Sequence, residues 1–489
     1  MSQAVHLATP PSLHFPELAK LLGDRYTENN FERAFYRRDL AFVPPILEMV
    51  LARTLPQCVA RPRDADEVAA LVRGARTHQL AITPRAAATT VYWNSVPTRA
   101  GIVIDLNALR GIVSVNAENL TATVLPATRW GELDAALRRR GLATRTYPTS
   151  APSATVGGWV SMEGFGIGSL QFGGLAQQLI ALDVVLPDGR AHHATRDSDP
   201  PLSWFLGSEG TLGIITAIEL AIRRAPEKTG KHLVALRDLV AVQNVARALA
   251  QSAPTPYNLH FSDAAHLRLL RAAGFAPPTE QAMLLITYEG DANHIAAGAQ
   301  NVYAIAQKFG GEILPDDLAA REWGERFAAL RVKRAGPTVL GSETWLRADR
   351  LAEYGADVAH LANRQRVTLA TYGTLVTQDE FTVMTVYPSD ESRQLAYIFD
   401  LSLTKQLYDL AFRRGGRPYG IGFWNAPYRH RAMPAHELAE RRARKRQLDP
   451  TNGMNPDKIF VASPILSPLI FSLGMNALAW ARRVGGAWR

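Results

Sequence analysis

The sequence predicts an α+β fold built from more than one domain. Its 489 residues exceed what one hydrophobic core normally holds. Hydrophobic residues make up 47% of the chain and charged residues 20%, which excludes a globally disordered protein. Short β-branched runs also alternate with amphipathic helical stretches along the whole chain, which is typical of mixed α and β structure.

The first 225 residues contain such alternating elements. A helix is expected from Arg61 to His78, where Pro62 precedes an apolar face. Four β-rich runs predict strands, at 81–83, 101–106, 121–125 and 181–187, and a second helix is expected at 130–140. A basic, proline-containing junction at 223–231 begins a second α+β unit, in which residues 376–380 are expected to connect the two strands of a hairpin.

Charge and cysteine content exclude several functions. The chain carries 54 Lys plus Arg against 45 Asp plus Glu, but it lacks a basic motif interleaved with aromatic residues, so no nucleic-acid partner is expected. The net charge of +9 leaves anionic lipid, an acidic protein or an anionic substrate open. The single cysteine, Cys58, excludes an internal disulfide and an iron–sulfur cluster held by this chain alone.

The two ends of the sequence differ in character. Residues 1–15 have neither the basic start nor the apolar run of a secretory signal, so a cytoplasmic location is expected. Residues 465–481 are uncharged and apolar with near-helical spacing. This run is shorter than the roughly 20 residues of a membrane span. It is expected to be an interfacial helix, a docking helix or a helix packed on its own domain.

A glycine-rich stretch is the most informative local feature. Seven glycines lie between Gly157 and Gly174, a density expected for neither a helix nor a strand. Glycine allows backbone N–H groups to approach an anionic group such as a pyrophosphate. Because apolar residues are interleaved, we expect a buried ligand loop rather than a surface loop. A Walker loop and a strand–GxGxxG–helix signature are both missing from the sequence.

Several ordered segments carry a family resemblance. They are Arg61-Pro62 with Asp66-Glu67-Val68, 83–90, 150–158, 182–189, 207–216 and Asn455-Pro456-Asp457-Lys458-Ile459. Together they resemble the FAD-binding superfamily of vanillyl-alcohol oxidase and p-cresol methylhydroxylase, in its branch of D-lactate dehydrogenases and glycolate oxidase flavin subunits. The resemblance implies an N-terminal extension (1–55), a two-part FAD-binding domain (56–225), an α+β cap domain for the substrate (226–440), a C-terminal segment returning to the FAD domain (441–462) and an apolar tail helix (463–489).

The resemblance also implies which residues contact FAD. The expected set is Arg85, Ala86, Ala87, Ala88, Thr89, Thr90, Ser150, Thr155, Gly157, Gly158, Ser161, Gly164, Glu209, Gly210, Ile215, Asn455 and Lys458. One departure concerns 86–88, where the family has glycines and this chain has three alanines. Alanine is costly wherever φ is positive, so either this loop keeps negative φ throughout or FAD is held more weakly.

A second departure concerns catalysis. In this branch of the family, two histidines position a metal ion and a base. The corresponding segments of this chain, 372–380 and 418–422, contain no histidine, so no catalytic metal is expected. Tyr419 stands where one histidine is missing and becomes the leading candidate for proton exchange, with Asn425 and Tyr372 nearby in the same segments. Arg331 is a candidate clamp for a substrate carboxylate, against the alternative of a solvated helix face, and His260 is a further candidate base.

The resemblance therefore implies an FAD-dependent dehydrogenase. It would oxidise a hydroxylated small molecule, in this branch a 2-hydroxy acid such as D-lactate or glycolate, by hydride transfer to the flavin, although the missing histidines leave an alcohol open as the substrate. The basic charge balance and the apolar tail favour reoxidation by an iron–sulfur protein or a membrane quinone, with peripheral membrane contact through the tail, and oxygen stays open as an acceptor. Two alternatives remain open. One is an FAD-containing electron-transfer or assembly subunit without substrate chemistry of its own, and the other is an interaction protein with an empty FAD fold.

FAD is expected to be bound noncovalently. The loop at 85–90 has no histidine to form a covalent link, and Cys58 precedes the FAD-binding segments. Acid precipitation of the holoprotein should therefore leave a yellow supernatant, measured by its absorbance. A yellow pellet over a colourless supernatant would show a covalent bond.

Overall fold

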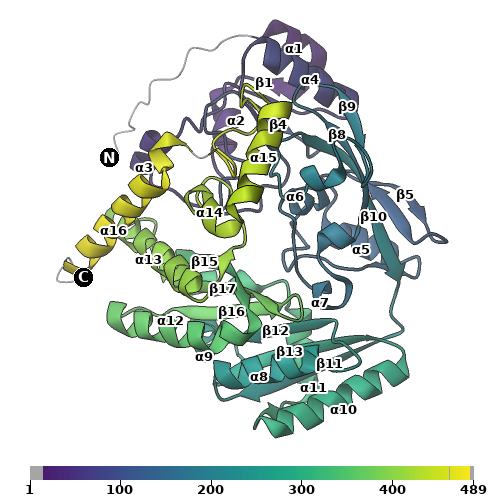
Figure 1. The fold of residues 1–489 in the computed structure, drawn as a ribbon, viewed down its shortest axis with the longest axis vertical. Coiled ribbons are helices and arrows are strands. Elements are labelled where there is room, and N and C mark those ends of the chain that lie inside the picture. The colour runs from purple at the N-terminus through teal and green to yellow at the C-terminus, as the bar shows by residue number, and fades with distance from the viewer. Residues whose placement is uncertain (1–14, 462, 485–489) are drawn as a thin grey trace.

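The fold rests on three β-sheets, seen in a computed structural model that describes residues 15–461 and 463–484. The first sheet has the order β1-β2-β4-β3, formed by Tyr26–Thr27, Cys58–Ala60, Ile102–Asp105 and Ile82–Arg85. The second contains β5 (Ile112–Asn116), β6 (Thr121–Val124), β10 (Ile214–Arg224), β8 (Leu179–Val185) and β9 (Ala191–Ala194), with β7 (Leu142–Thr144) paired to β10. These two sheets lie together at one end of the molecule (Figure 1).

The first sheet also takes in residues expected to form an N-terminal extension. Strand β1 pairs with β2, while β2, β4 and β3 pair in parallel. Helix α4 (Ala65–Thr77) buries its apolar face on this sheet and begins after Asp64, whose side chain accepts from the Glu67 amide. Three further N-terminal helices are α1 (Pro16–Leu22), α2 (Asn30–Phe35) and α3 (Pro45–Leu51).

The glycine-rich stretch folds differently from the expectation. Helix α6 (Val156–Ser161) and the short α7 (Ser169–Phe172) both lie in it, so the prediction that it forms no helix was wrong. Thr155 caps α6 by accepting from the Gly158 amide. A Cβ on Gly157 would lie 2.6 Å from Pro126 Cβ. The absence of a side chain at this position therefore lets helix α6 pack closely against Pro126, and it does not serve to form a loop. Helix α5 (Trp130–Arg138) packs in the same core.

The third sheet belongs to the cap and is antiparallel. Its order is β14-β11-β13-β12-β16-β17-β15-β18, formed by Glu312–Ile313, Lys228–Leu236, Ala282–Gly290, Asn258–Ser262, Ala370–Leu375, Glu380–Ser389, Thr338–Arg347 and Arg417–Pro418. The expected hairpin is confirmed, because β16 and β17 pair antiparallel across a short turn. Helices α8 (Leu239–Ala250), α10 (Ala292–Lys308), α12 (Leu351–Gln365) and α13 (Gln394–Arg413) share one apolar core with this sheet. Helices α9 (Ala264–Ala272) and α11 (Asp316–Gly324) pack in the other large core.

The C-terminal part returns from the cap to the first sheet. After α14 (Arg429–Ala432), helix α15 (Ala435–Leu448) runs back beside the N-terminal half of the chain (Figure 1). The Asn455 amide then donates to Ile82 O on β3, and Arg99 pairs with Asp457 at 2.6 Å. Helix α16 (Pro468–Val484) covers part of α13. Within the described residues, no helix is long and apolar enough to cross a bilayer.

Lys445 on α15 anchors this return. Its buried ammonium donates to Asp449 Oδ2, Thr211 O and Met454 O at 2.6, 2.8 and 2.7 Å. A Lys445→Met substitution should lower the free energy of unfolding by about 3 kcal/mol, because it leaves the Asp449 carboxylate buried without its cation. Urea unfolding checks this value. Arg446→Met, at an exposed position on the same helix, is the matched control, and equal effects of the two substitutions would contradict the assignment.

Candidate active site

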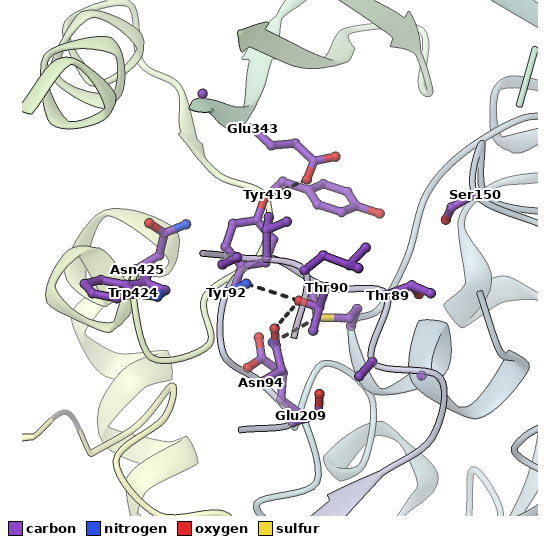
Figure 2. A pocket seen from close by; sticks show the side chains of 18 of the residues that line it. Thr89, Thr90, Tyr92, Asn94, Ser150, Glu209, Glu343, Tyr419, Trp424 and Asn425 are labelled. Atoms are coloured by element: carbon purple, nitrogen blue, oxygen red, sulfur yellow. Dashed lines mark hydrogen bonds between the residues drawn. The ribbon is translucent and has the colours of Figure 1, made fainter. Parts of the chain in front are cut away.

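One large cavity lies between the cap sheet and the two smaller sheets. Its volume is about 1080 Å³, and its walls come from the loop after β3, the start of α6, the start of β10, strands β15 to β17 and the segment from Tyr419 to Asn425. Figure 2 shows these walls meeting, with Thr90, Tyr92 and Asn94 on one side and Glu343 and Tyr419 opposite. The cavity is therefore made by segments that are distant in sequence.

Most residues expected to contact FAD line this cavity. They are Arg85, Ala86, Ala87, Ala88, Thr89, Thr90, Ser150, Thr155, Gly157, Gly158, Ser161, Glu209, Gly210 and Ile215. Gly164, Asn455 and Lys458 are absent from the lining. The Gly164 backbone instead packs against the Trp159 ring, where a Cβ would lie 2.0 Å from Nε1. The structure therefore brings most of the expected FAD-contacting residues to the cavity surface. Gly164, Asn455 and Lys458 do not reach that surface.

The amide groups of two segments differ in what they can offer an anion. The Val156 and Gly157 amides donate to Thr128 O and Pro126 O. These two N–H groups are therefore not free to donate to a pyrophosphate, contrary to the expectation from the sequence. In contrast, the amides of residues 87–90 donate to no acceptor within the part of the chain that the structure describes. Unpartnered amides facing a cavity fit a diphosphate well. We therefore expect the loop at 87–90, rather than the run from Thr155 to Gly158, to hold the diphosphate of FAD.

This loop contains a residue in the left-handed region. Ala88 has φ of +51°, so the alternative that the alanine-rich loop keeps negative φ throughout was wrong. Ala86 and Ala87 are not among the residues with positive φ. An alanine in this region costs about 1–2 kcal/mol because its Cβ crowds the backbone. The loop thus reaches the shape that glycine would adopt freely, at a cost in stability.

Arg85 supports the loops beside the cavity. Its Nη1 donates to Arg38 O and Ser95 O at 2.8 and 3.2 Å, and its guanidinium lies over the Tyr36 ring. Because these contacts occupy the guanidinium, Arg85 contributes to the cavity wall without a free charged group. The guanidinium positions the N-terminal segment rather than offering a free charge to the diphosphate.

Glu209 joins three parts of the chain at the cavity wall. Its carboxylate accepts from the Gly422 amide at 2.9 and 3.0 Å and from the Ile421 amide at 3.3 Å. Asn455 Nδ2 donates to Glu209 O at 2.6 Å, and Lys458 Nζ donates to Asn455 Oδ1 at 2.6 Å. Burial raises the pKa of Glu209 to about 7, partly offset by these amide donors. Asn455 and Lys458 therefore act through Glu209 and not from the cavity surface.

The expected catalytic residues are placed unequally. Tyr419, Asn425 and Tyr372 line the cavity, but both hydroxyls and the Asn425 side-chain nitrogen already have partners. The Tyr419 hydroxyl accepts from the Phe165 amide at 3.0 Å and donates to Phe165 O at 3.2 Å. Asn425 Nδ2 donates to Tyr408 Oη at 2.8 Å, and Tyr372 Oη lies 3.1 Å from Met384 Sδ. Burial raises the pKa of both Tyr419 and Tyr372.

The structure does not bring Arg331 to the cavity. Its guanidinium pairs with Glu322 at 3.6 Å and with Glu325, and it lies over the Phe275 ring. From the same turn, η4 (Ala329–Ala335), Lys333 is exposed and lines the cavity. Helical geometry directs residues two positions apart to different sides, which explains why the neighbouring cation reaches the cavity.

A carboxyl group that sequence reasoning missed faces the cavity. Glu343 on β15 accepts a hydrogen bond from Tyr92 Oη at 2.6 Å, across the junction between the cap and the smaller sheets (Figure 2). Burial raises the pKa of Glu343 above its usual value, with the Tyr92 contact opposing the shift. The available signal was a lone acid inside the strand-like run from Thr338 to Arg347. Tyr92 is held in turn by Gly420, where a Cβ would lie 2.4 Å from its ring.

His260 lines the cavity, and its surroundings favour the neutral imidazole. Its Nδ1 lies 2.9 Å from Thr374 Oγ1, and burial lowers its pKa to about 4. A neutral imidazole is a weak base here, which favours Glu343 over His260 as a proton acceptor. Within residues 15–461 and 463–484, no three His, Cys, Asp or Glu side chains gather in a way that could hold a metal ion.

Comparison with protein families agrees with the placement of the cavity. Residues 56–195 match the model of the FAD binding domain, and residues 225–459 match that of the C-terminal domain of FAD linked oxidases. Residues of both matched segments line the cavity, together with Glu209 to Ile215 in the stretch between them, and the loop with unpartnered amides fits the diphosphate of FAD. Bound FAD would contact the loop at 86–90 and the wall from Glu209 to Ile215.

Named relatives cover most of the chain. The glycolate oxidase subunit GlcD of Bacillus subtilis is 26% identical over 431 residues, which is 83% of this chain and 90% of the relative. The mitochondrial D-lactate dehydrogenase [cytochrome] of Arabidopsis thaliana is 24% identical over 470 residues, 91% of this chain and 79% of the relative. Among solved structures, p-cresol methylhydroxylase with substrate bound aligns with a TM-score of 0.78 at 14% identity, over 91% of this chain and 96% of the other.

Ala88 allows a direct test of the strained loop. An Ala88→Gly substitution should raise the free energy of unfolding of the holoprotein by about 0.5–1 kcal/mol, because relief of the left-handed strain exceeds the entropy cost of glycine. Urea unfolding measures the change. Ala86→Gly is the matched control and should be destabilising, since φ is not positive at that position. A destabilised Ala88→Gly protein would contradict the analysis.

Sequence, fold and cavity lead to one family. The first matched family model covers most strands of the two smaller sheets, and the second covers the cap sheet. Residues from both parts line one cavity, which fits FAD. The chain belongs to the FAD linked oxidases, with their FAD binding domain at residues 56–195 and their C-terminal domain at residues 225–459. Within that family it resembles the glycolate oxidase subunit and the D-lactate dehydrogenase named above, and it shares the fold of p-cresol methylhydroxylase.

Proposed function

We propose that this protein is a dehydrogenase for a 2-hydroxy acid, with Glu343 as the proton acceptor. The observation that carries the proposal is the Glu343–Tyr92 pair, a cavity-facing carboxylate held by a phenol at 2.6 Å. The names of relatives support the substrate class, because they include a glycolate oxidase subunit, D-lactate dehydrogenases and a D-2-hydroxyglutarate dehydrogenase from Xanthomonas citri.

The chemistry needs a base because the substrate hydroxyl must lose its proton as the neighbouring C–H bond breaks. Bound FAD supplies the acceptor for the hydride. The Glu343 carboxylate takes the hydroxyl proton, and Tyr92 orients that carboxylate by donating to it. Lys333 is the exposed cation of the lining that can meet a substrate carboxylate. In this mechanism Tyr419 and Asn425 shape the cavity wall through their existing hydrogen bonds.

Reoxidation would use a partner outside this chain. An iron–sulfur protein or a membrane quinone fits a chain with one cysteine, because this protein cannot build a cysteine-ligated cluster of its own. A cytoplasmic location, with access to the membrane surface, agrees with both acceptors. The second candidate function is an FAD-containing electron-transfer or assembly subunit, favoured by the missing histidines at 372–380 and 418–422.

Anaerobic titration of the holoprotein tests the proposal. D-lactate, glycolate, D-2-hydroxyglutarate and simple alcohols are added while the visible flavin bands are recorded. One of the 2-hydroxy acids should bleach the bands. Bleaching by a simple alcohol alone would overturn the substrate class, and a flavin spectrum that no compound bleaches would favour the electron-transfer subunit.

Glu343→Gln should slow flavin reduction by about 10²–10⁴-fold, since amide oxygen is a poor proton acceptor. Wild-type reduction should accelerate as pH rises through the raised pKa of Glu343, because the carboxylate is the active form, and level off above it. Stopped-flow absorbance gives both the rate and its pH profile. Glu312→Gln, exposed on β14, is the control, and a Glu343→Gln rate equal to that control would exclude the role.

A further inference from the structure

Two helices leave an apolar surface exposed beside the cavity. We call it the α3/α16 face, formed by Ile46, Met49 and Val50 of α3 and Leu469, Ile470, Leu473 and Trp480 of α16. These side chains are between 54% and 69% exposed. Figure 1 shows α3 and α16 along the same side of the molecule, away from the three sheets. Large aliphatic side chains gathered in this way on one face mark an interaction surface.

The inner sides of the same helices form one end of the cavity. Leu47 and Leu51 of α3 and Phe471, Met475 and Leu478 of α16 line it. Three further lining residues, Leu40, Ile465 and Ile470, are 66%, 44% and 54% exposed. At these three residues the cavity lining reaches the exposed surface at or beside the α3/α16 face, and we call this apolar end of the cavity the passage.

Positive charge flanks this face at the end of α16. A smaller cavity of about 360 Å³ is lined by Arg364, Arg413 and Arg483, next to the exposed ring of Trp480. None of these three arginines forms an ion pair within residues 15–461 and 463–484. The acid of the same lining, Asp409, is paired with Lys405 at 2.6 Å. The smaller cavity therefore has unneutralised positive charge suited to a phosphate group.

We propose that the α3/α16 face rests on the surface of an anionic lipid bilayer. Its aliphatic side chains would enter the boundary between headgroups and hydrocarbon, Trp480 would lie at the headgroup level, and Arg364, Arg413 and Arg483 would meet lipid phosphates. A bilayer fits better than a protein partner because this surface combines aliphatic side chains, one tryptophan and arginines without an opposing acid. The docking itself does not depend on the proposed substrate or proton acceptor, whereas its link to an electron acceptor rests on the proposed function.

Docking in this way would direct the apolar passage towards the bilayer. The apolar walls of the passage offer few hydrogen-bonding groups to a small hydrophilic acid. Entry of a lipid-soluble molecule is favourable, because its apolar surface stays out of water. The bilayer would thus present a hydrocarbon-bearing reactant, such as an electron acceptor, directly to the cavity. No chain segment would need to cross the membrane.

Vesicle flotation of the full-length holoprotein tests the proposal. Vesicles of phosphatidylcholine, with or without phosphatidylglycerol, are mixed with protein at low and high salt. The protein should float with the anionic vesicles at low salt, and high salt should weaken this binding. Failure of the wild-type protein to float with any vesicle would overturn the proposal.

Two sets of variants separate the apolar and charged contributions. The double substitution Leu469→Asp and Leu473→Asp should lower vesicle partitioning by at least about tenfold, because it removes buried apolar area. Val113→Asp, at a residue of β5 that is 60% exposed, is the control. Arg364→Glu with Arg413→Glu should abolish the preference for anionic vesicles, whereas Arg237→Glu with Arg347→Glu, both exposed on the cap, should retain most of it.

Flavin absorbance and circular dichroism of each variant confirm that it is folded. Equal flotation of the Leu469→Asp, Leu473→Asp protein and of the control would overturn the proposal. Light scattering without vesicles adds a further readout. Concentration-dependent self-association that this variant loses would assign the face to a second copy of the chain and would also overturn the proposal.

Discussion

The buried carboxylate of Glu209 is the contact on which the arrangement of this protein depends. Its oxygens accept amide donors from Ile421 and Gly422 in the segment leaving the cap, and its backbone oxygen accepts from Asn455 in the returning C-terminal segment. A charged group without such donors would be too costly to bury. Glu209 therefore holds three distant segments together where the cavity wall is formed.

The cavity depends on this closure for its chemistry. Tyr92 follows the loop at 87–90, which we expect to hold the diphosphate of FAD, and its hydroxyl donates to Glu343 on the cap sheet. Gly420 and Gly422 allow the returning segment to pass against Tyr92, since a Cβ at either position would lie within 2.4 Å of its atoms. The loop proposed to hold the diphosphate and the proposed proton acceptor, Glu343, are thus linked by Tyr92, so the same packing that closes the fold also positions this carboxylate.

Part of the site could be predicted from residue order and part could not. The loop at 85–90 and the segment from Glu209 to Ile215 carry family motifs, and both line the cavity. The glycines near Gly157 were misjudged because glycine also permits close helix packing, which a one-dimensional pattern does not separate from loop formation. Glu343 was missed because a single acid in a strand has no local signature, and its role comes from Tyr92, which lies 251 residues away in the chain.

The sequence by itself determined the α+β class, the hairpin between β16 and β17, the segments at 85–90 and 209–215 that line the cavity, and the apolar character of the tail. These depend on local patterns of polarity, glycine and β-branched residues, which neighbouring residues decide. Only the tertiary structure decided that Ala88 adopts positive φ, that Arg331 is occupied by acids while Lys333 reaches the cavity, and that α3 lies with α16. The physical reason is that strain, charge pairing and exposure depend on which distant segments pack together.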